Sequence, residues 1–207
     1  MAVISDQGTL FSLTDDLNGN PTPFIRLRAG YTIMSRHTIS VLYAPLSVKS
    51  EGSATFPIDF EGETFPANTP INASYTFNSY RITYRYDFVK KPKFEFGLGL
   101  TAKIRDAEIA LKGNGLSAKK TNVGFVRIIN FKFNWKANEK FGILLEGDAL
   151  AAPQGRAEDV LIAVSYKLSD KLDLKTGYRI LEGGADNSEV YNFSLFNYAM
   201  VGLCISL

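Results

Sequence analysis

The sequence predicts an all-β fold, an up-and-down antiparallel barrel of ten strands, with eight strands as the alternative count. Three observations support this prediction. Apolar and polar residues alternate with a period of two in one segment after another, which is the period of a β-strand. No segment shows the 3.6-residue period of an amphipathic helix. Short polar links between the segments alternate with longer links, as in a barrel with short turns at one end and loops at the other.

Length and composition are consistent with a single domain over residues 1–207. The chain is 45% apolar and 13% aromatic, which excludes wholesale disorder. No run of eighteen apolar residues is present, so no helix is expected to span a bilayer. One cysteine, Cys204, rules out an internal disulfide, and one histidine, His37, argues against a zinc site made by the protein alone. We therefore expect no metal and no cofactor. The formal net charge of +2 says little about partners by itself, and no nucleic-acid partner is expected.

The clearest strands flank the Lys-Lys-Pro-Lys sequence at residues 90–93. Residues 78–88 place aromatic and aliphatic side chains on one face and small or charged side chains on the other, and residues 94–105 repeat the pattern. These two segments predict a hairpin. Strands with the same alternation are predicted over residues 23–34, 124–135, 140–151, 159–168, 172–180 and 191–207.

The strand count depends on two less regular segments. Residues 38–48 are apolar on both faces, so the pattern predicts a strand without orienting it. That gives nine strands from residue 22 onward, whereas an up-and-down barrel with both termini at the same end has an even number. Residues 3–16 are therefore the predicted tenth strand, and the count falls to eight if this and one other segment form a loop or plug.

The links decide which ends of the strands lie together. Short polar links are predicted at residues 35–37, 89–92, 137–139 and 169–171. The alternate links are mostly longer and rich in Gly, Ser, Asn and Pro, and they cover residues 49–71, 112–121, 153–158 and 183–189. Short turns thus gather at one end of the molecule and longer loops at the other, the arrangement typical of a transmembrane barrel.

The apolar face is predicted to contact lipid and the charged face to line the interior. Many strands have the roughly 9–11 residues that cross a bilayer at a tilt. Aromatic residues of the apolar face gather beside the short turns, as in an interfacial girdle, and one arginine shares that face near the long-loop end. The predicted lipid-interface residues are Phe88, Phe94, Arg127, Phe133, Trp135, Phe141 and Tyr166.

The opposite face carries charged residues in nearly every strand, which an apolar ligand-binding calyx would not tolerate. About ten positive charges face about five negative ones, so a narrow interior would be basic, and it would be either closed or weakly selective for anions. The predicted interior charges are Arg26, Arg28, Arg81, Arg85, Asp87, Glu95, Lys103, Arg105, Lys132, Glu146, Asp148, Lys167, Asp173, Lys175 and Arg179.

The chain resembles the small outer-membrane β-barrel proteins of Gram-negative bacteria over residues 22–207. The resemblance is carried by the aromatic-polar strand "YRITYRYDF", the hairpin "YKLSDKLDLKTGYR" and an alternating C-terminal strand. It implies short periplasmic turns, longer extracellular loops and contact with outer-membrane lipid and lipopolysaccharide. It also implies export, so we expect that a signal peptide has been removed from this chain. Leu207 departs from the aromatic residue that usually ends such barrels as part of their assembly signal.

Catalytic motifs are weak in this sequence. There is no Gly-x-Ser-x-Gly elbow and no phosphate-binding glycine loop, and "GLGLTA" indicates small residues opposite bulky inward side chains. His37, with Ser40 three residues on, is the one candidate for the histidine used by enzymes of similar barrels, but a turn histidine is the simpler interpretation. Glu146 and Asp148 could form a carboxylate pair for acid–base chemistry or, as we favour, pair with inward arginines and lysines.

Three functional hypotheses follow. The first is a non-enzymatic outer-membrane barrel, monomeric, and either a narrow pore for small anionic solutes or a structural protein closed by salt bridges. The second is an outer-membrane enzyme acting on lipid or peptide at the outer rim. The third is a soluble lipocalin-like carrier, which requires the aromatic girdle to face inward.

Overall fold

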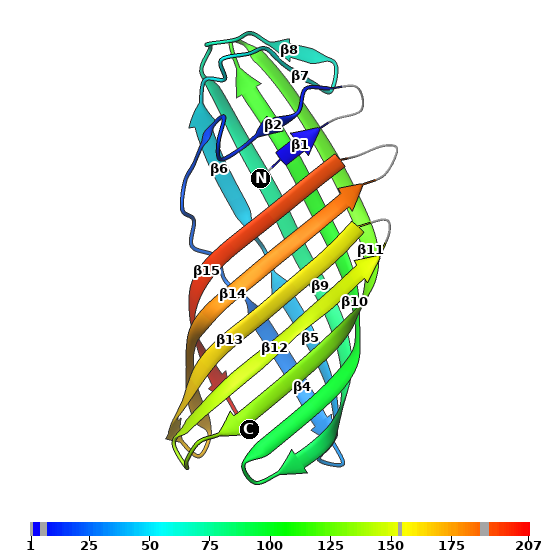
Figure 1. Ribbon diagram of the computed structural model, residues 1–207, viewed down its shortest axis with the longest axis vertical. Coiled ribbons are helices and arrows are strands. Elements are labelled where there is room, and N and C mark those ends of the chain that lie inside the picture. Colours follow the sequence, from blue (N-terminus) through cyan, green and yellow to red (C-terminus); the bar gives the residue numbers. More distant parts are fainter. Residues whose placement is uncertain (1, 5–7, 153–154, 187–190) are drawn as a thin grey trace.

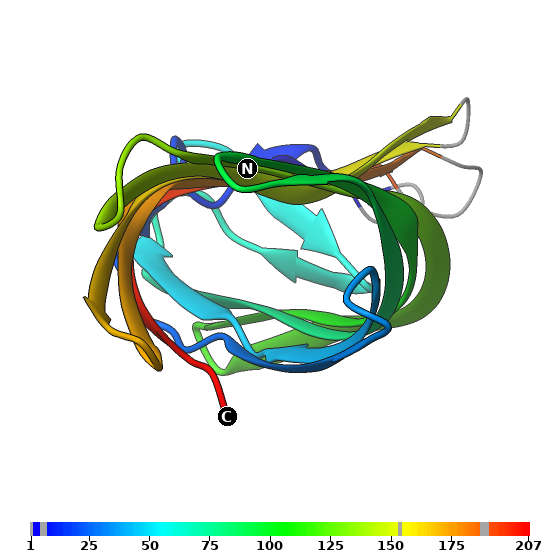
Figure 2. The same cartoon turned by 90° about the horizontal axis from the view of Figure 1, so that it is seen from below.

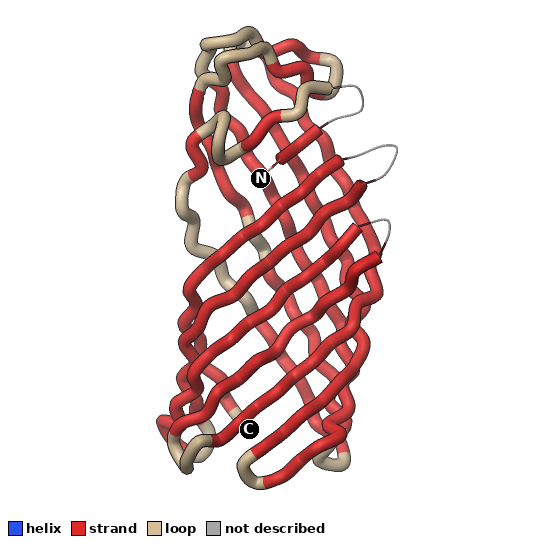
Figure 3. Tube along the Cα trace, viewed as in Figure 1, coloured by secondary structure: helices blue, strands red, loops and turns tan. Residues whose placement is uncertain are grey.

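The computed structural model describes residues 2–4, 8–152, 155–186 and 191–207, and it is all-β, with 76% of the chain in strands. One antiparallel sheet contains thirteen strands, and a separate hairpin adds two more (Figures 1 and 3). Among the described residues, no helix is long and apolar enough to cross a membrane.

Each long strand pairs in antiparallel fashion with the next long strand along the chain. Short links at the lower end of Figure 1 join them in pairs, and polar turn residues occupy these links. The strands of this meander are β4 (Leu27–Ile33), β5 (His37–Ala44), β9 (Ile71–Lys91), β10 (Phe94–Gly113), β11 (Leu116–Lys136), β12 (Phe141–Ala152), β13 (Gly155–Ser169), β14 (Leu172–Asp186) and β15 (Tyr191–Ile205).

The sheet curls into a half-barrel, as the view from below shows (Figure 2). Its order is β2-β1-β15-β14-β13-β12-β11-β10-β9-β5-β4, where β1 is Ala2–Ile4 and β2 is Phe11–Ser12. Within the described part of the chain, β4 pairs only with β5, and β15 pairs with β14 and with three residues of β1. A seam therefore separates β4 from β15. Side chains bridge it, since the ring of Phe24 lies 4.8 Å from that of Tyr198, centroid to centroid.

The remaining strands are short and lie toward the long-loop end. They are β1 (Ala2–Ile4), β2 (Phe11–Ser12), β3 (Asn18–Gly19), β6 (Ser47–Gly52), β7 (Ile58–Phe60) and β8 (Glu63–Phe65). β7 and β8 form a hairpin at the top of Figure 1, and β6 pairs with β3 and with the upper part of β9. Together they cover the long-loop end of the curled sheet.

A hydrophobic core fills this end. It is built from the N-terminal segment, the β7–β8 hairpin and the inward residues of the upper parts of β9, β10 and β11. Its most deeply buried members are Phe11, Leu17, Ile58, Phe60, Phe65, Ile71 and Leu111. The long-loop end thus packs like a water-soluble domain, with its apolar side chains inside.

Several predicted boundaries differ from the structure. The loop predicted at residues 112–121 is wrong, because β10 and β11 continue until a two-residue turn at Asn114 and Gly115, both with positive φ. The strand predicted over 38–48 is broken at Pro45 and Leu46, where proline cannot donate to the ladder.

The predicted count of ten strands is not confirmed. The segment 3–16 forms only the short β1 and β2, and residues 5–7 of it lie outside the described residues. Of the longer links, 153–158 and 183–189 also fall partly outside the described residues.

Candidate functional site: an interior ion-pair network

Each of the strands β9, β10 and β11 changes its chemistry partway along its length. The inward residues of β9 are apolar from Ile71 to Phe77 and polar from Ser79 to Asp87, and both sets are buried. Its outward residues change in the opposite sense. They are polar from Asn72 to Asn78, and from Tyr80 to Phe88 they are aromatic or aliphatic. The lower half of the molecule is therefore polar inside and apolar outside.

The outward apolar residues of the lower half form a continuous surface, which we call the apolar band. It contains outward residues of β4, β5 and β9 to β15, many of them more than two-fifths exposed. On β9 it runs from Tyr80 to Phe88 and on β10 from Phe94 to Ile104. Its most exposed large members are Ile25, Leu27, Tyr31, Ile82, Leu100, Val123, Phe125, Val201, Leu203 and Ile205.

The upper limit of the band crosses the hydrogen-bonded rows of the sheet. On β9 and β10 the limit is the paired residues Asn78 and Asp106. On β13 the limit is Glu158. The row of paired residues that contains Glu158 passes through β12, β11 and β10 and reaches β9 at Tyr84, six residues after Asn78. Because the strands of a barrel are tilted, the limit of the band falls in different rows on different strands.

The centre of the interior holds an ion-pair network with Asp159 at its centre. Oδ1 of Asp159 lies 2.5 Å from Nη1 of Arg179, and Oδ2 lies 2.6 Å from Nη2 of Arg81 and 2.8 Å from Nη2 of Arg26. Arg81 also donates to Asp148 at 2.6 Å, and Arg179 lies 3.5 Å from Glu146. The side chains of Arg81, Asp148 and Asp159 are at most 3% exposed.

Neutral side chains complete the coordination of the second carboxylate. Oδ1 of Asp148 accepts hydrogen bonds from Thr101 at 2.7 Å and from Nδ2 of Asn130 at 2.8 Å. Thr101 is also 2.7 Å from the hydroxyl of Thr83, and Nε of Arg81 donates to Ser79 at 2.9 Å. A buried carboxylate with this many donors keeps its charge satisfied.

A second group of charges lies between the network and the short turns. Glu95 is 3.3 Å from Nζ of Lys136 and 3.8 Å from Nζ of Lys132, and Nε of Arg85 donates to Asp87 at 3.2 Å. Glycine makes room here, since a Cβ at Gly97 would collide with the carboxylate of Asp87. The side chains of Glu95, Lys132 and Lys136 are more exposed than those of the central network.

A cavity of about 740 Å³ opens among the short turns below these charges. Lysines are the commonest charged residues around it, at positions 93, 136, 140 and 167, with Glu139, Asp170 and Asp173 as the acidic ones. In the turn after β13, a hydrogen bond from Lys167 lowers the pKa of the Asp170 carboxyl. The cavity therefore presents a wet, mixed but predominantly basic mouth to the surroundings.

The structure brings together part of the predicted interior set. Arg26, Arg81, Arg179, Glu146 and Asp148 meet in the central network. Lys103 is buried with its Nζ 4.9 Å from the ring centroid of Phe77, and Arg105 donates to Asn122 at the upper limit of the band. Asp173 and Lys175 are half-buried toward the short turns.

Two residues of the predicted interior set are exposed. Arg28 lies on β4, the edge strand beside the seam, in the same row as the inward residues Leu42 and Arg81, and its charge acts on the interior carboxylate of Glu146. Lys167 reaches out of the short-turn end to contact Asp170 at 2.7 Å, because it lies only two residues before the end of β13.

Sequence reasoning missed Asp159, the central residue of the network. It stands at the first position of the predicted strand 159–168, with the same parity as the inward residues Leu161 and Ala163, and this parity was the signal that could have identified it. Asn130 was placed on the inward face without a role, and Thr101 likewise. Tyr198, which accepts from Arg26 at 3.3 Å, had no sequence signal.

The predicted interface aromatics lie together near the short turns. The ring of Phe94 is 4.9 Å from that of Phe133, and the ring of Phe141 is 4.8 Å from that of Tyr166. Phe88 and Trp135 are exposed on the same outer surface. The first pair is edge-to-face, a geometry that aromatic side chains in contact favour, and the second is tilted.

Catalytic arrangements around His37 are not assembled. Its Nδ1 is 2.9 Å from the hydroxyl of Tyr84, and its ring lies 4.9 Å from that of Tyr86, centroid to centroid. Ser40 is buried on the opposite face of β5, so the two side chains point apart. In the described part of the chain, no group of three His, Cys, Asp or Glu side chains could hold a metal ion.

Comparison with known proteins yields no match to the chain from a family model, a curated protein or a solved structure. The functional argument therefore depends on the geometry of the band, the network and the cavity.

Proposed function

We propose that the chain is a non-enzymatic outer-membrane β-barrel protein whose interior is closed by ion pairs. The observation that carries this proposal is the inverted polarity of the lower half, with a continuous apolar band outside and arginine–carboxylate pairs inside. In water such a surface would drive aggregation, whereas in a bilayer it is the favourable arrangement.

The dimensions of the band support a membrane location. Its extent on β9 and β10 is close to the roughly 9–11 residues that a tilted strand needs to cross the hydrocarbon core. Its lower part carries the aromatic residues Phe88, Phe94, Phe133, Trp135, Phe141 and Tyr166. Bilayers impose these two features on the barrels that span them.

The packing of the interior supports a closed barrel. Arg81, from one wall, reaches Asp148 and Asp159 of the facing wall, and the three side chains are almost inaccessible to solvent. Above this network the hydrophobic core formed with Phe60 and Phe65 fills the long-loop end. A path for solutes would have to displace both, so a structural role is favoured over a general pore.

A weak conductance for anions is the second candidate. The cavity at the short turns is lined by four lysines, which would attract anions to the closed network. Transient separation of Arg81 from its partners would then open a narrow basic path.

Two measurements test the proposed function. The purified chain should partition into detergent and should migrate differently on a gel when unheated and when boiled. In planar bilayers under a salt gradient it should give no steady conductance, or small anion-selective events. Large, steady, porin-sized conductance or cation selectivity would overturn the closed interior, and failure to insert would overturn the membrane location.

A further inference from the structure

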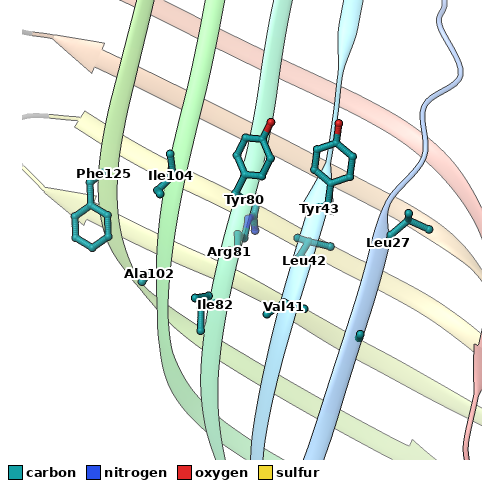
Figure 4. A pocket seen from close by; sticks show the side chains of 11 residues that line it. Leu27, Val41, Leu42, Tyr43, Tyr80, Arg81, Ile82, Ala102, Ile104 and Phe125 are labelled. Carbon is teal, nitrogen blue, oxygen red and sulfur yellow. The ribbon is translucent and has the colours of Figure 1, made fainter.

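A hollow lies on the outer surface of the apolar band, on the wall formed by β4, β5, β9, β10 and β11 (Figure 4). Its volume is about 510 Å³, within the range of about 300–1,000 Å³ typical of small-molecule sites. Two alanines, Ala29 and Ala102, leave space between larger neighbours such as Ile82, Ile104 and Phe125. The rings of Tyr43 and Tyr80 stack across one side of it at 5.3 Å, centroid to centroid.

Arg127 adjoins this hollow. It is the register partner of Ala102 on the neighbouring strand, and it is exposed on the same outer face as Phe125 and Ile129. No described residue forms an ion pair with it. An arginine on the lipid face is costly unless its charge is compensated, and its long side chain can extend toward the headgroup level. The hollow thus offers apolar space for an acyl chain. Beside it lies the Arg127 guanidinium, which has no ion-pair partner among the described residues.

We propose that the hollow and Arg127 form a binding site for one phosphate-bearing lipid, with an acyl chain along Ala29 and Ala102 and the phosphate on the guanidinium. This inference rests on the proposed function, because it requires the band to face a bilayer. A planar guanidinium can bind a phosphate through two parallel hydrogen bonds. A second copy of this chain fits less well, because a symmetric contact would place two hollows face to face and leave both Arg127 side chains among apolar residues.

Native mass spectrometry of the folded chain in detergent tests the inference, with phosphatidylglycerol and phosphatidylcholine as probes at equal concentration. Both probes carry phosphate, but only the first has a net negative charge. The expected result is retention of a single phosphatidylglycerol, preferred over phosphatidylcholine by about tenfold, the effect of one charge-assisted contact. Arg127→Gln should abolish the preference, and Ala102→Phe should abolish retention of both lipids by filling the hollow.

Two matched variants serve as controls. Lys119→Gln removes an exposed cation from the same strand above the band, and Ala199→Phe enlarges an exposed alanine on β15, away from the hollow. Both should retain lipid as the parent chain does. Equal retention of the two probes by the parent chain, or an unchanged preference in Arg127→Gln, would overturn the inference. If Ala102→Phe does not fold, the Arg127→Gln comparison decides alone. A chain that fails to insert defeats the proposed function, whereas one that inserts without this preference defeats only the lipid site.

Discussion

The guanidinium of Arg81 on β9 lies 2.6 Å from the carboxylate of Asp148 on β12, although β10 and β11 separate these strands in the sheet. The contact therefore crosses the interior of the curled sheet rather than following a cross-strand pair. It ties two walls together at the height where the apolar band surrounds the molecule. Stability and closure of the interior thus depend on the same few atoms.

Replacement of Arg81 should be strongly destabilising. Arg81→Ala leaves the buried Asp148 without an arginine, and loss of one partner of a buried ion pair costs about 3–5 kcal/mol. The free energy of unfolding, measured by urea titration of the refolded chain in detergent, should fall by this amount. Lys119→Ala, which removes an exposed pair with Glu108, should change it by less than about 1 kcal/mol. Equal effects of the two variants would contradict the network as described.

Neutralising Asp159 should affect conductance as well as stability. Asp159→Asn keeps the shape of the side chain but leaves Arg26, Arg81 and Arg179 facing one another without their shared carboxylate. Their repulsion should loosen the closed centre, so anion conductance in planar bilayers should rise above that of the parent chain. Asp173→Asn, nearer the short turns, provides the matched control. A cation-selective increase in Asp159→Asn would show that the interior is not basic.

The turn between β10 and β11 should depend on glycine. Gly115 has φ of +78°, a conformation that side chains with a Cβ adopt with strain. Gly115→Ala should lower the free energy of unfolding by about 1 kcal/mol, whereas Ser117→Ala on the exposed face of β11 should change it by less than about 0.5 kcal/mol. The same urea titrations measure both. An unaffected Gly115→Ala would indicate that this turn adopts a different conformation.

The seam should be visible in hydrogen exchange. β4 is hydrogen-bonded on one side only, whereas β10 is paired along its length with both β9 and β11. Amides of β4 that point away from β5 should exchange faster than those of β10, because no strand protects them. Peptide-level exchange followed by mass spectrometry compares the two directly. Protection of β4 equal to that of β10 would mean that its outer edge is paired.

Local alternation predicted the inward and outward sides of β9 and β10 well, because a strand with one apolar face has few alternative registers. The same pattern gave no warning that Lys112, Asn114 and Gly115 lie on or between long strands. These residues have loop-like composition. Lys112 is held in the sheet by its pairing with Asn72 and Ser117, and Asn114 and Gly115 form the turn itself.

The ion-pair network was harder to predict. Parity assigned Arg81 and Asp148 to the interior, but their partnership depends on the curl of the sheet and on the tilt of its strands. Neither can be read from one segment at a time. Asp159 was missed because it stands at the end of its alternating run, where the period carries least information.

The change of chemistry between Asn78 and Ser79 has a consequence for how the chain finds its native pairing. A one-residue slip of β9 would turn Arg81 toward the outside and Tyr80 toward the inside, and in the same movement it would expose Tyr75 and Phe77 above them. A single misalignment would therefore carry two penalties, one for charged side chains moved to the apolar outer face and one for apolar side chains removed from the core. The correct register of β9 is thus favoured at both ends of the strand. The strands that pair with β9 take their register from it.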